Sequence, residues 1–546
     1  MKRLKLPKGI QTFDDIRLGD YVYVDKTKYL VDLIDNGKPY FLSRPRRFGK
    51  SLTISTFDAL FSGKKELFRG LYAEEFMNRP DYQPNPVIHL DMSTINTAEG
   101  ITGIKKSLLN LTRGLARKLK IELSGTKMYG DLLSELIVKT AEKHNRKVVV
   151  LVDEYDKPYT DFVSDSVMAN RVRNVLRDYY AQIKVNDKYI HFIFITGISK
   201  FVKMGVFSTL NNLTDISMMP KYAEICGYTA DELNNYFPDY LKETAEEMEI
   251  SVEELIERMR HYYNGFCFDR EAKARLYNPF STLLFFDEKD FTNYWIESGN
   301  PRFIADYMKD RHLTVEQFRN MPVSKGFSRS PGDLDTTDPH GFLFQSGYLT
   351  LRPGISDELS LDYPNTEVLN SMSELLARNI LRDADGDFTQ CRSDLLIGLM
   401  NNNHDRIIGA LNRLLASNPY DDFAGAARQS ISYNDYDFDA QEWLYRSTIL
   451  AFLRGCGVVV TAEMHTNKGR SDIVVTHKGQ TYVIELKVVR QSESAEKKVE
   501  DALRQMIDNH YAEPFPNATL LCLCIDNEVR QITVSRAVAH DIIHDR

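Results

Sequence analysis

RPRRFGKS, the segment from Arg44 to Ser51, lies between the apolar run PYFLS and the longer run SLTISTFDALF. In the longer run the apolar residues recur at helical spacing, namely Leu52, Ile54, Phe57, Leu60 and Phe61. A strand, a loop and a helix in this order are the context in which a P-loop holds phosphate groups. Gly49 lets the backbone approach a phosphate, and the free N–H groups at the helix start favour an anion. The segment therefore predicts a loop that binds nucleotide phosphates.

The residues of this loop have different expected parts in binding ATP and its magnesium ion. We expect Lys50 to contact the β- and γ-phosphates and Ser51 to offer its hydroxyl to Mg²⁺. The first glycine of the usual G-x-x-x-x-G-K-[ST] pattern is replaced by Arg44. The residues predicted to bind ATP are Arg44, Pro45, Arg46, Arg47, Phe48, Gly49, Lys50, Ser51, Leu52 and, from a later strand, Asp153.

The run RKVVVLVDEYD predicts that later strand, because an unbroken apolar stretch ends in acids. Charge at the end of a buried strand is costly unless it meets water, a partner or a cation. We expect Asp153 to hold Mg²⁺ through water and Glu154 to orient or deprotonate the attacking water. Two solvated acids are the alternative interpretation. A further strand predicted at 86–91 favours the branch of P-loop proteins that use a catalytic glutamate.

A third apolar strand, HFIFITGISKF, ends in polar residues where a sensor of the γ-phosphate would stand. Thr196 is the first candidate for this catalytic role, and a hydroxyl that caps the turn before Gly197 is the alternative. A neighbouring subunit of a homo-oligomer could also receive an arginine from the helix after the acidic strand, although most helix arginines are solvated. The arginines in question are Arg171, Arg173 and Arg177.

The composition is that of an ordinary globular protein, with 43% hydrophobic and 27% charged residues. A chain of 546 residues has room for about two to four domains. The net charge of −8 gives no general attraction to nucleic acid, so DNA contacts must come from local basic patches. We find neither a signal peptide nor an apolar run of the roughly 20 residues that span a bilayer. The six cysteines are scattered, and the close pair in the run LLCLCI, Cys522 and Cys524, indicates core packing and a reducing cytoplasm.

Short β-rich runs alternate with helical stretches up to about residue 198, which is the pattern of a parallel sheet flanked by helices. The predicted strands are 39–43, 86–91, 147–153 and 191–196. The next segment turns helical and predicts a lid or a winged-helix-like appendage. A strand pair is expected near GFLFQSGYLTL. The predicted divisions are 1–225 for the P-loop domain, 226–290 for the helical lid, 291–435 for a mixed connecting region and 436–546 for a C-terminal α/β domain.

A carboxylate pair stands out in the C-terminal part, in the run GRSDIVVTHKGQTYVIELKV. The run predicts two strands joined by a tight turn at Lys478 and Gly479, which places Asp472 opposite Glu485. Directly opposed residues have Cβ atoms about 4.5–5.5 Å apart, and opposed like charges destabilise a sheet. A divalent cation removes this objection. Lys487 projects from the same face as Glu485 and can position or activate the attacking water.

Oxygen ligands of this kind suit Mg²⁺ or Mn²⁺. Glu442, on the preceding helix, is a candidate third metal ligand, and an ordinary acid at a helix start is the alternative. Gln505, on the following helix, is either part of the site or a surface residue. For the hairpin as a whole, the alternative is a surface hairpin with scattered charges, but its flanking residues are those of a core sheet.

Many ordered blocks of the chain resemble one family, the bacterial AAA-ATPase-like proteins fused to a C-terminal nuclease domain of the PD-(D/E)xK superfamily. The blocks are LPKGIQTFDDIR, YVDKTKYL, RPRRFGKS, LVDEYDKP, TGISKF, YNGFCF, YNPFS, YWIESGNP, FQSGYLTL, YPNTEV, GRSDIVV and YVIELKV. In these relatives the P-loop also begins with an arginine-rich stretch. The resemblance implies nuclease residues at Asp472, Glu485 and Lys487, with Glu442 and Gln505 as less secure matches.

The leading hypothesis is a cytoplasmic ATPase whose nucleotide state gates or positions a Mg²⁺- or Mn²⁺-dependent nuclease that acts on DNA. One alternative is a nucleotide-switch regulator of the signal-transducing ATPase type, with a nuclease fold that only binds. Another is a metal-dependent phosphodiesterase that acts on RNA or a nucleotide, because function belongs to sites and not to folds.

Overall fold

The computed structural model describes residues 3–37, 39–126, 128–162, 165–198, 200, 212–295, 314–324, 326–327, 340–354, 358–381, 386–417, 440–465, 470–489, 493–515 and 517–539. The chain folds into two compact units. The first comprises Met1–Gly299 and Asn320–Glu367, and the second comprises Asn300–Arg319 and Val368–Arg546. The finer division into four parts stays a prediction.

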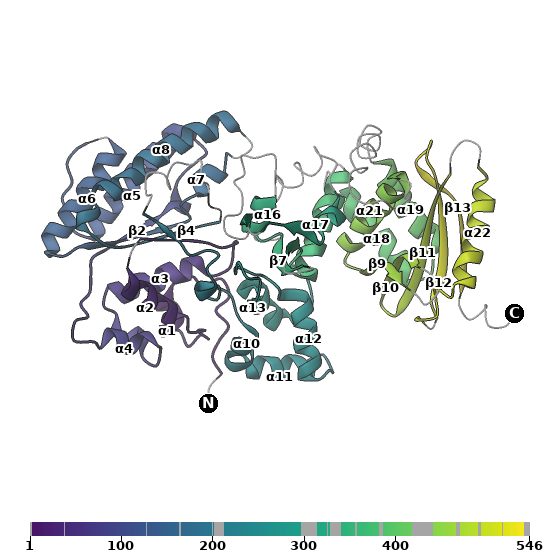
Figure 1. The fold of residues 1–546 in the computed structure, drawn as a ribbon, viewed down its shortest axis with the longest axis horizontal. Coiled ribbons are helices and arrows are strands. Elements are labelled where there is room, and N and C mark those ends of the chain that lie inside the picture. The colour runs from purple at the N-terminus through teal and green to yellow at the C-terminus, as the bar shows by residue number, and fades with distance from the viewer. Residues whose placement is uncertain are drawn as a thin grey trace. The chain divides into compact units, whose positions relative to one another are not determined.

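The first unit is built on a five-stranded sheet in the order β2-β3-β4-β1-β5, in which all paired neighbours are parallel (Figure 1). Its strands are β1 Tyr40–Ser43, β2 Val87–Asp91, β3 Val148–Asp153, β4 Ile190–Gly197 and β5 Thr214–Asp215. The four strands predicted from apolar runs are confirmed to within one residue at each end. β4 lies between β1 and β3 and is parallel to both. The P-loop, which follows β1, and the acids that end β3 therefore lie at the same carboxyl end of the sheet, on either side of Gly197.

Helices cover both faces of this sheet (Figure 1). One face carries α5 Gly100–Lys118, α6 Tyr129–His144 and α8 Ser166–Val185, whose apolar residues share a core with Ile193. The other face carries α3 Lys50–Phe61, where the ring of Phe57 lies 4.8 Å from that of Phe194. Neighbouring residues of β4 thus serve opposite cores, as strand alternation requires. The remaining helices of this region are α1 Phe13–Leu18, α2 Thr27–Asn36, α4 Ala73–Met77 and α7 Lys157–Thr160.

The segment that follows the sheet is helical, as predicted, and we refer to its helices as the lid. Its helices are α10 Ala230–Tyr236, α11 Pro238–Glu247, α12 Val252–Tyr263 and α13 Pro279–Glu288. The starts of three of these helices are capped, because Thr229 forms a capping box with Glu232, and the side chains of Ser251 and Asn278 also accept backbone N–H groups. Three residues of the N-terminal segment, Leu6, Val22 and Val24, pack into the core of this lid.

The region after the lid contains α16 His340–Gln345 and a small antiparallel sheet in the order β6-β8-β7. Its strands are β6 Met321–Val323, β7 Thr350–Pro353 and β8 Leu359–Asp362. The predicted strand pair is therefore present but begins later, because GFLFQ is helical. Leu343, Phe344 and Gln345 are all buried, and three consecutive buried side chains do not fit a strand with one solvated face.

A buried carboxyl stands at the end of the first unit. Glu367 is the second residue of α17 Thr366–Ile380 and has no exposed surface. Its Oε1 accepts hydrogen bonds from the Ser281 hydroxyl and from the Trp295 backbone N–H, both at 2.9 Å. Burial raises the pKa of this carboxyl to about 8.

The second unit holds a sheet in the order β13-β12-β11-β10-β9, in which only the pair β11 and β12 is parallel. Its strands are β9 Val459–His465, β10 Arg470–His477, β11 Gln480–Val489, β12 Thr519–Asp526 and β13 Gln531–Ala539. One face packs against α18 Gly386–Met400, α19 His404–Ala416 and α21 Ala440–Gly455, and the other packs against α22 Ala495–Asp508 (Figure 1). The predicted order of helix, hairpin, helix and strand is confirmed, with β9 and β13 added at the edges.

Two expectations drawn from composition can be compared with this fold. All six cysteines are free and buried, and Cys522 and Cys524 lie in β12, so the core-packing interpretation is confirmed. None of the helices in the described ranges combines the length and the apolar character that crossing a bilayer requires.

Candidate functional site

The P-loop joins β1 to α3 through residues in left-handed conformation. Gly49, the N-cap of α3, has a φ of 93°, which glycine adopts without strain, and Arg47 has a φ of 65°. Lys50 begins α3 and is buried. Its Nζ donates to the carbonyl oxygens of Arg44 and Pro45, at 2.9 Å each. The loop is thus folded around the ammonium group that is predicted to bind phosphates.

Arg44, in place of the first glycine of the motif, points into the protein interior. Its guanidinium is buried and donates to four carbonyl oxygens, those of Ser43, Ser217, Tyr222 and Ala223. It also lies 4.3 Å from the centre of the Phe268 ring. The side chain therefore ties the loop to the segment that leads into the lid, and a part for Arg44 in nucleotide binding would come through the shape of the loop.

Other loop side chains also contact the lid and the region after it. The ring of Phe48 lies 4.8 Å from that of Phe266, and the guanidinium of Arg47 lies 4.8 Å from the centre of the Phe280 ring. Gly347 makes room for Pro45, because a Cβ there would lie 2.7 Å from the Pro45 Cγ. The loop is thus packed against neighbours that a change of its conformation would displace.

The end of β3 brings the predicted acids to this loop. Asp153 is buried, and its Oδ1 accepts hydrogen bonds from the Thr196 hydroxyl at 2.6 Å and from the Glu154 N–H at 3.0 Å. The hydroxyl of Thr196, the predicted sensor, therefore holds the carboxylate of Asp153, which is predicted to bind Mg²⁺. Glu154 has a φ of 50°, which is a strained conformation for a residue with a Cβ. Ser51 is half-buried in the first turn of α3.

The charges at this edge of the sheet act on one another. Burial lowers the pKa of the Lys50 ammonium, and the nearby Asp153, Glu154 and Asp156 oppose that effect. Burial raises the pKa of Glu154, with further upward contributions from Asp153 and Asp91, against the opposing charge of Lys50. Two acids that the motif analysis did not select, Asp91 and Asp156, thus belong to the same electrostatic environment. Their signal in the sequence was their position at or just after a strand end.

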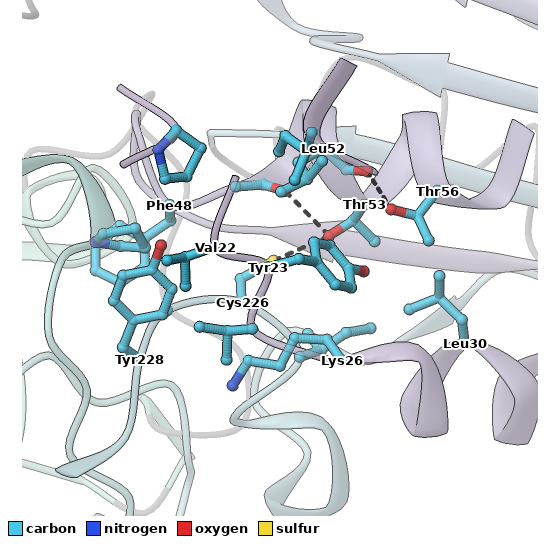
Figure 2. Close-up of a pocket in the computed structure, with 17 residues that line it drawn as sticks. Val22, Tyr23, Lys26, Leu30, Phe48, Leu52, Thr53, Thr56, Cys226 and Tyr228 are labelled. Carbon is cyan, nitrogen blue, oxygen red and sulfur yellow. Dashed lines mark hydrogen bonds between the residues drawn. The ribbon is translucent and has the colours of Figure 1, made fainter. Parts of the chain in front are cut away.

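A pocket lies beside the P-loop, between α3, the N-terminal segment and the start of the lid (Figure 2). Its ≈ 560 Å³ of empty space includes the opening to solvent, and the enclosed part is ≈ 70 Å³. Gly49 and Thr53 line it from the loop side, and the Thr53 hydroxyl lies 3.0 Å from the Gly49 carbonyl and 3.5 Å from the Cys226 sulfur. The side chains of Tyr23 and Tyr228 line it as well.

The wall of this pocket joins distant parts of the chain. Lys26 lines the pocket, and its Nζ lies 2.6 Å from both carboxylate oxygens of Glu232 in the lid. Nearer the start of the chain, Arg3 pairs with Glu243 and Lys8 pairs with Asp287. The residues of this pocket carry no common motif in the sequence and are brought together only by the fold.

The hairpin of the second unit has the predicted register. Lys478 and Gly479 form the turn with φ values of 45° and 83°, and Ile473 pairs with Ile484, so the next residues outward are Asp472 and Glu485. Asp472 accepts two hydrogen bonds in the structure. The Arg446 guanidinium donates to Oδ1 at 3.2 Å, and the Leu486 backbone N–H donates to Oδ2 at 2.9 Å.

Glu485 is buried beside Lys487, whose Nζ donates to Glu485 Oε1 at 2.9 Å. The other oxygen, Oε2, is buried and has no hydrogen-bond partner among the described residues. Burial raises the pKa of Glu485, and so does the negative charge of Asp472. Burial lowers the pKa of the Lys487 ammonium, but the negative charge of the neighbouring Glu485 outweighs this effect and raises the pKa to about 12. The pair therefore holds a lysine that stays charged and one carboxylate oxygen that needs a partner.

Glu442 lies on α21 and its charge acts on both Glu485 and Lys487, so the fold brings the predicted third acid near the hairpin. Gln505 is exposed on α22, where its Nε2 lies 3.4 Å from the Tyr511 hydroxyl. Within the described ranges, no three His, Cys, Asp or Glu side chains form a complete metal cage. Asp472 and Glu485 nevertheless suit Mg²⁺, which binds through one or two carboxylates and keeps waters and phosphates as its other ligands.

Comparisons with known proteins give two matches to family models. A model described as a predicted AAA-ATPase matches residues 7–207, and a model described as the PD-(D/E)XK nuclease superfamily matches residues 440–535. Among solved structures, Cdc6p from Pyrobaculum aerophilum is similar over 69% of this chain and 94% of its own, with 13% identity and a TM-score of 0.19.

A full-length relative supports the same assignment. An uncharacterized protein in the vnfD 5' region of Azotobacter chroococcum mcd 1 is 33% identical over 524 residues, which cover 94% of each chain. The resemblance inferred from the ordered sequence blocks is confirmed. The chain therefore belongs to the family of predicted AAA-ATPases that carry a C-terminal domain of the PD-(D/E)XK nuclease superfamily.

Proposed function

We propose that this protein binds and hydrolyses Mg-ATP in its first unit, and that the nucleotide state gates or positions a Mg²⁺- or Mn²⁺-dependent nuclease in its second unit. DNA is the proposed substrate. The ATPase part rests on the P-loop around Lys50, the acids at the end of β3 and the pocket beside Gly49. In this arrangement the phosphates lie at the start of α3 and the base enters the pocket.

In the proposed reaction of the first unit, Asp153 holds the magnesium ion through water, and its bond to Thr196 keeps the carboxylate in place. Glu154 orients the attacking water, and the raised pKa of its carboxyl suits a group that accepts a proton during hydrolysis. Arg44 bonds to the segment that leads into the lid, and Phe48 packs against two aromatic rings of the lid region. Through these contacts, a change of the loop on nucleotide binding would move the lid region.

The observation that carries the nuclease part is the buried Glu485 Oε2, which has no hydrogen-bond partner among the described residues. A buried carboxylate oxygen without a partner is costly, and a divalent cation at this oxygen removes the cost. Such an ion would polarise a phosphate oxygen and lower the pKa of a bound water. Lys487 keeps its proton, holds Glu485 Oε1 and presents a positive charge to the phosphate.

Supercoiled and linear plasmid DNA, incubated with the purified chain and Mn²⁺, with and without ATP, would test this proposal. We expect Asp472→Asn, Glu485→Gln and Lys487→Ala to lose most cutting. Glu500→Gln is the matched control, because Glu500 is an exposed acid on α22. Equal nicking by all variants would place the activity elsewhere or in a contaminant.

The same assay separates the alternatives. A single-stranded RNA in place of the plasmid tests the phosphodiesterase hypothesis, and cleavage of RNA alone would overturn DNA as the substrate. Absence of cleavage with every substrate, together with intact ATP binding, would favour the nucleotide-switch regulator. Cleavage that is unaffected by ATP and by Lys50→Ala would refute the gating part while leaving the nuclease part in place.

A further inference from the structure

A buried arginine lies within the acidic cluster of the hairpin. Arg446 is on α21, one helical turn after Glu442, and only 6% of its surface is exposed. Its Nη1 donates to Asp472 Oδ1 at 3.2 Å, and the side chains of both residues are largely buried. No sequence motif selected this residue, because an arginine in an amphipathic helix usually faces solvent.

The oxygens of the two hairpin carboxylates are unequally available. Asp472 Oδ1 is bonded to Arg446, and Asp472 Oδ2 is bonded to the Leu486 backbone N–H. Glu485 Oε1 is bonded to Lys487, whereas Oε2 has no hydrogen-bond partner among the described residues. A pair of metal ions needs a carboxylate that bridges them, with one oxygen on each ion. For Asp472 to serve in this way, both of its oxygens would have to bind metal, and the cationic guanidinium of Arg446 already holds Oδ1.

The charges lead to the same result. In the part of the chain that the structure describes, the cluster combines the carboxylates of Asp472, Glu485 and Glu442 with the cations Lys487 and Arg446, so that among these five groups the acids exceed the bases by one charge. One divalent ion reverses the sign and prepares the site for a phosphate. A second divalent ion would meet a net positive site in which the Arg446 guanidinium is held in a buried pair with Asp472.

We propose that Arg446 is a positioning residue that limits the nuclease site to one divalent cation, by holding the Asp472 oxygen that a second cation would require. The inference rests on the proposed nuclease function and concerns the same site. Arg446 also fixes the direction of Asp472 before metal binds. Because Oδ2 accepts from a neutral backbone N–H and not from a cation, this oxygen and Glu485 Oε2 could share the single ion.

Counting Mn²⁺ ions on the full chain, without nucleotide, tests the proposal by isothermal titration and by electron paramagnetic resonance. The ions that belong to the hairpin are those lost in Asp472→Asn. We expect one such ion in the wild type, with the spectrum of an isolated Mn²⁺. In Arg446→Met we expect a second ion and a spectrum with coupling between two neighbouring ions. Arg446→Lys, which keeps the positive charge, should restore the count of one.

The control is Arg454→Met. Arg454 lies on the same helix, is equally buried and forms an ion pair with Glu316, so its loss disturbs packing without touching the hairpin. Thermal unfolding gives a second readout: Mn²⁺ should raise the unfolding temperature of Arg446→Met more than that of the wild type, because the ion replaces the lost guanidinium. If Arg446→Met does not fold, the wild-type count and Arg446→Gln decide the question.

The outcomes distinguish this inference from the proposed function. Two hairpin ions in the wild type, or one ion with unchanged spectrum in Arg446→Met and Arg446→Gln, would overturn the role of Arg446 even if the protein cuts DNA. One ion in the wild type and two in Arg446→Met, in a protein that cuts no nucleic acid, would support the role of Arg446 and refute the nuclease function.

Discussion

Glu367→Gln should lower the free energy of unfolding in acidic solution and raise it in alkaline solution. In the folded protein the burial of Glu367 raises the pKa of its carboxyl from an ordinary value of 4.5 to about 8. The folded state therefore binds the proton more tightly than the unfolded state, and the stability that this carboxyl contributes is fully present below pH 4.5 and is lost as the pH rises to about 8. The loss amounts to about 1.4 kcal/mol per pH unit between these values, or on the order of 5 kcal/mol in total.

The glutamine variant has a different balance. Its amide oxygen can still accept from Ser281 and Trp295, but its NH₂ group replaces an oxygen that has no hydrogen-bond partner among the described residues. An unpaired buried donor costs about 1–3 kcal/mol at any pH. We therefore expect the variant to be less stable than the wild type by about 1–2 kcal/mol at pH 5 and more stable by about 2 kcal/mol at pH 8.

Urea unfolding followed by tryptophan fluorescence measures this difference. The chain has two tryptophans, Trp295 beside Glu367 and Trp443 in the second unit, so a Trp443→Phe background reports the first unit alone. Glu253→Gln is the control, because Glu253 is an exposed acid of the first unit. Two urea curves that stay a constant distance apart from pH 5 to pH 8 would show that Glu367 does not titrate as a buried acid, and the reasoning would be refuted.

Three further predictions concern the proposed sites. Lys50→Ala should abolish tight ATP binding in a folded protein, because its ammonium offsets charge on the β- and γ-phosphates; full affinity in a fluorescent-ATP titration would contradict this. Glu154→Gln should bind ATP but hydrolyse it slowly, and because the pKa of Glu154 is raised, wild-type hydrolysis should fall as the pH drops through that raised value, as phosphate release would show. Glu485→Gln should raise the unfolding temperature in EDTA by removing a buried charge that faces Asp472, and a gain of equal size in the exposed-site control Glu500→Gln would refute this cause.

Those elements whose signal is local could be predicted from the sequence. The strands of the first sheet are continuous apolar runs, and such runs are typical of strands that are buried on both faces. The hairpin register followed from the turn at Lys478 and Gly479. Side chains in a strand alternate between the two faces of the sheet, so the position of the turn fixes which residues face each other. The P-loop followed from the order of strand, loop and helix around Gly49.

The parts that could not be predicted depend on contacts between distant residues. Arg44 and Arg446 are both arginines that the fold turns inward, one toward backbone carbonyls and the other toward a carboxylate. Nothing in their neighbouring sequence distinguishes them from solvated arginines. The helix at GFLFQ was missed because a short apolar run fits a strand and a buried helix equally well.

The N-terminal segment and the lid share the wall of the proposed base pocket, and this arrangement affects kinetics more than affinity. If a nucleotide binds there, separating Lys26 from Glu232, or lifting the segment that carries Val22 from the lid core, would widen the pocket's opening to solvent. The outer contacts, such as Arg3 with Glu243, are partly exposed and each is worth only about 0.2–1 kcal/mol. The wall is thus held by one buried pair and several weak ones. If a nucleotide binds there, its dwell time would depend in part on this wall and would shorten as the ionic strength rises.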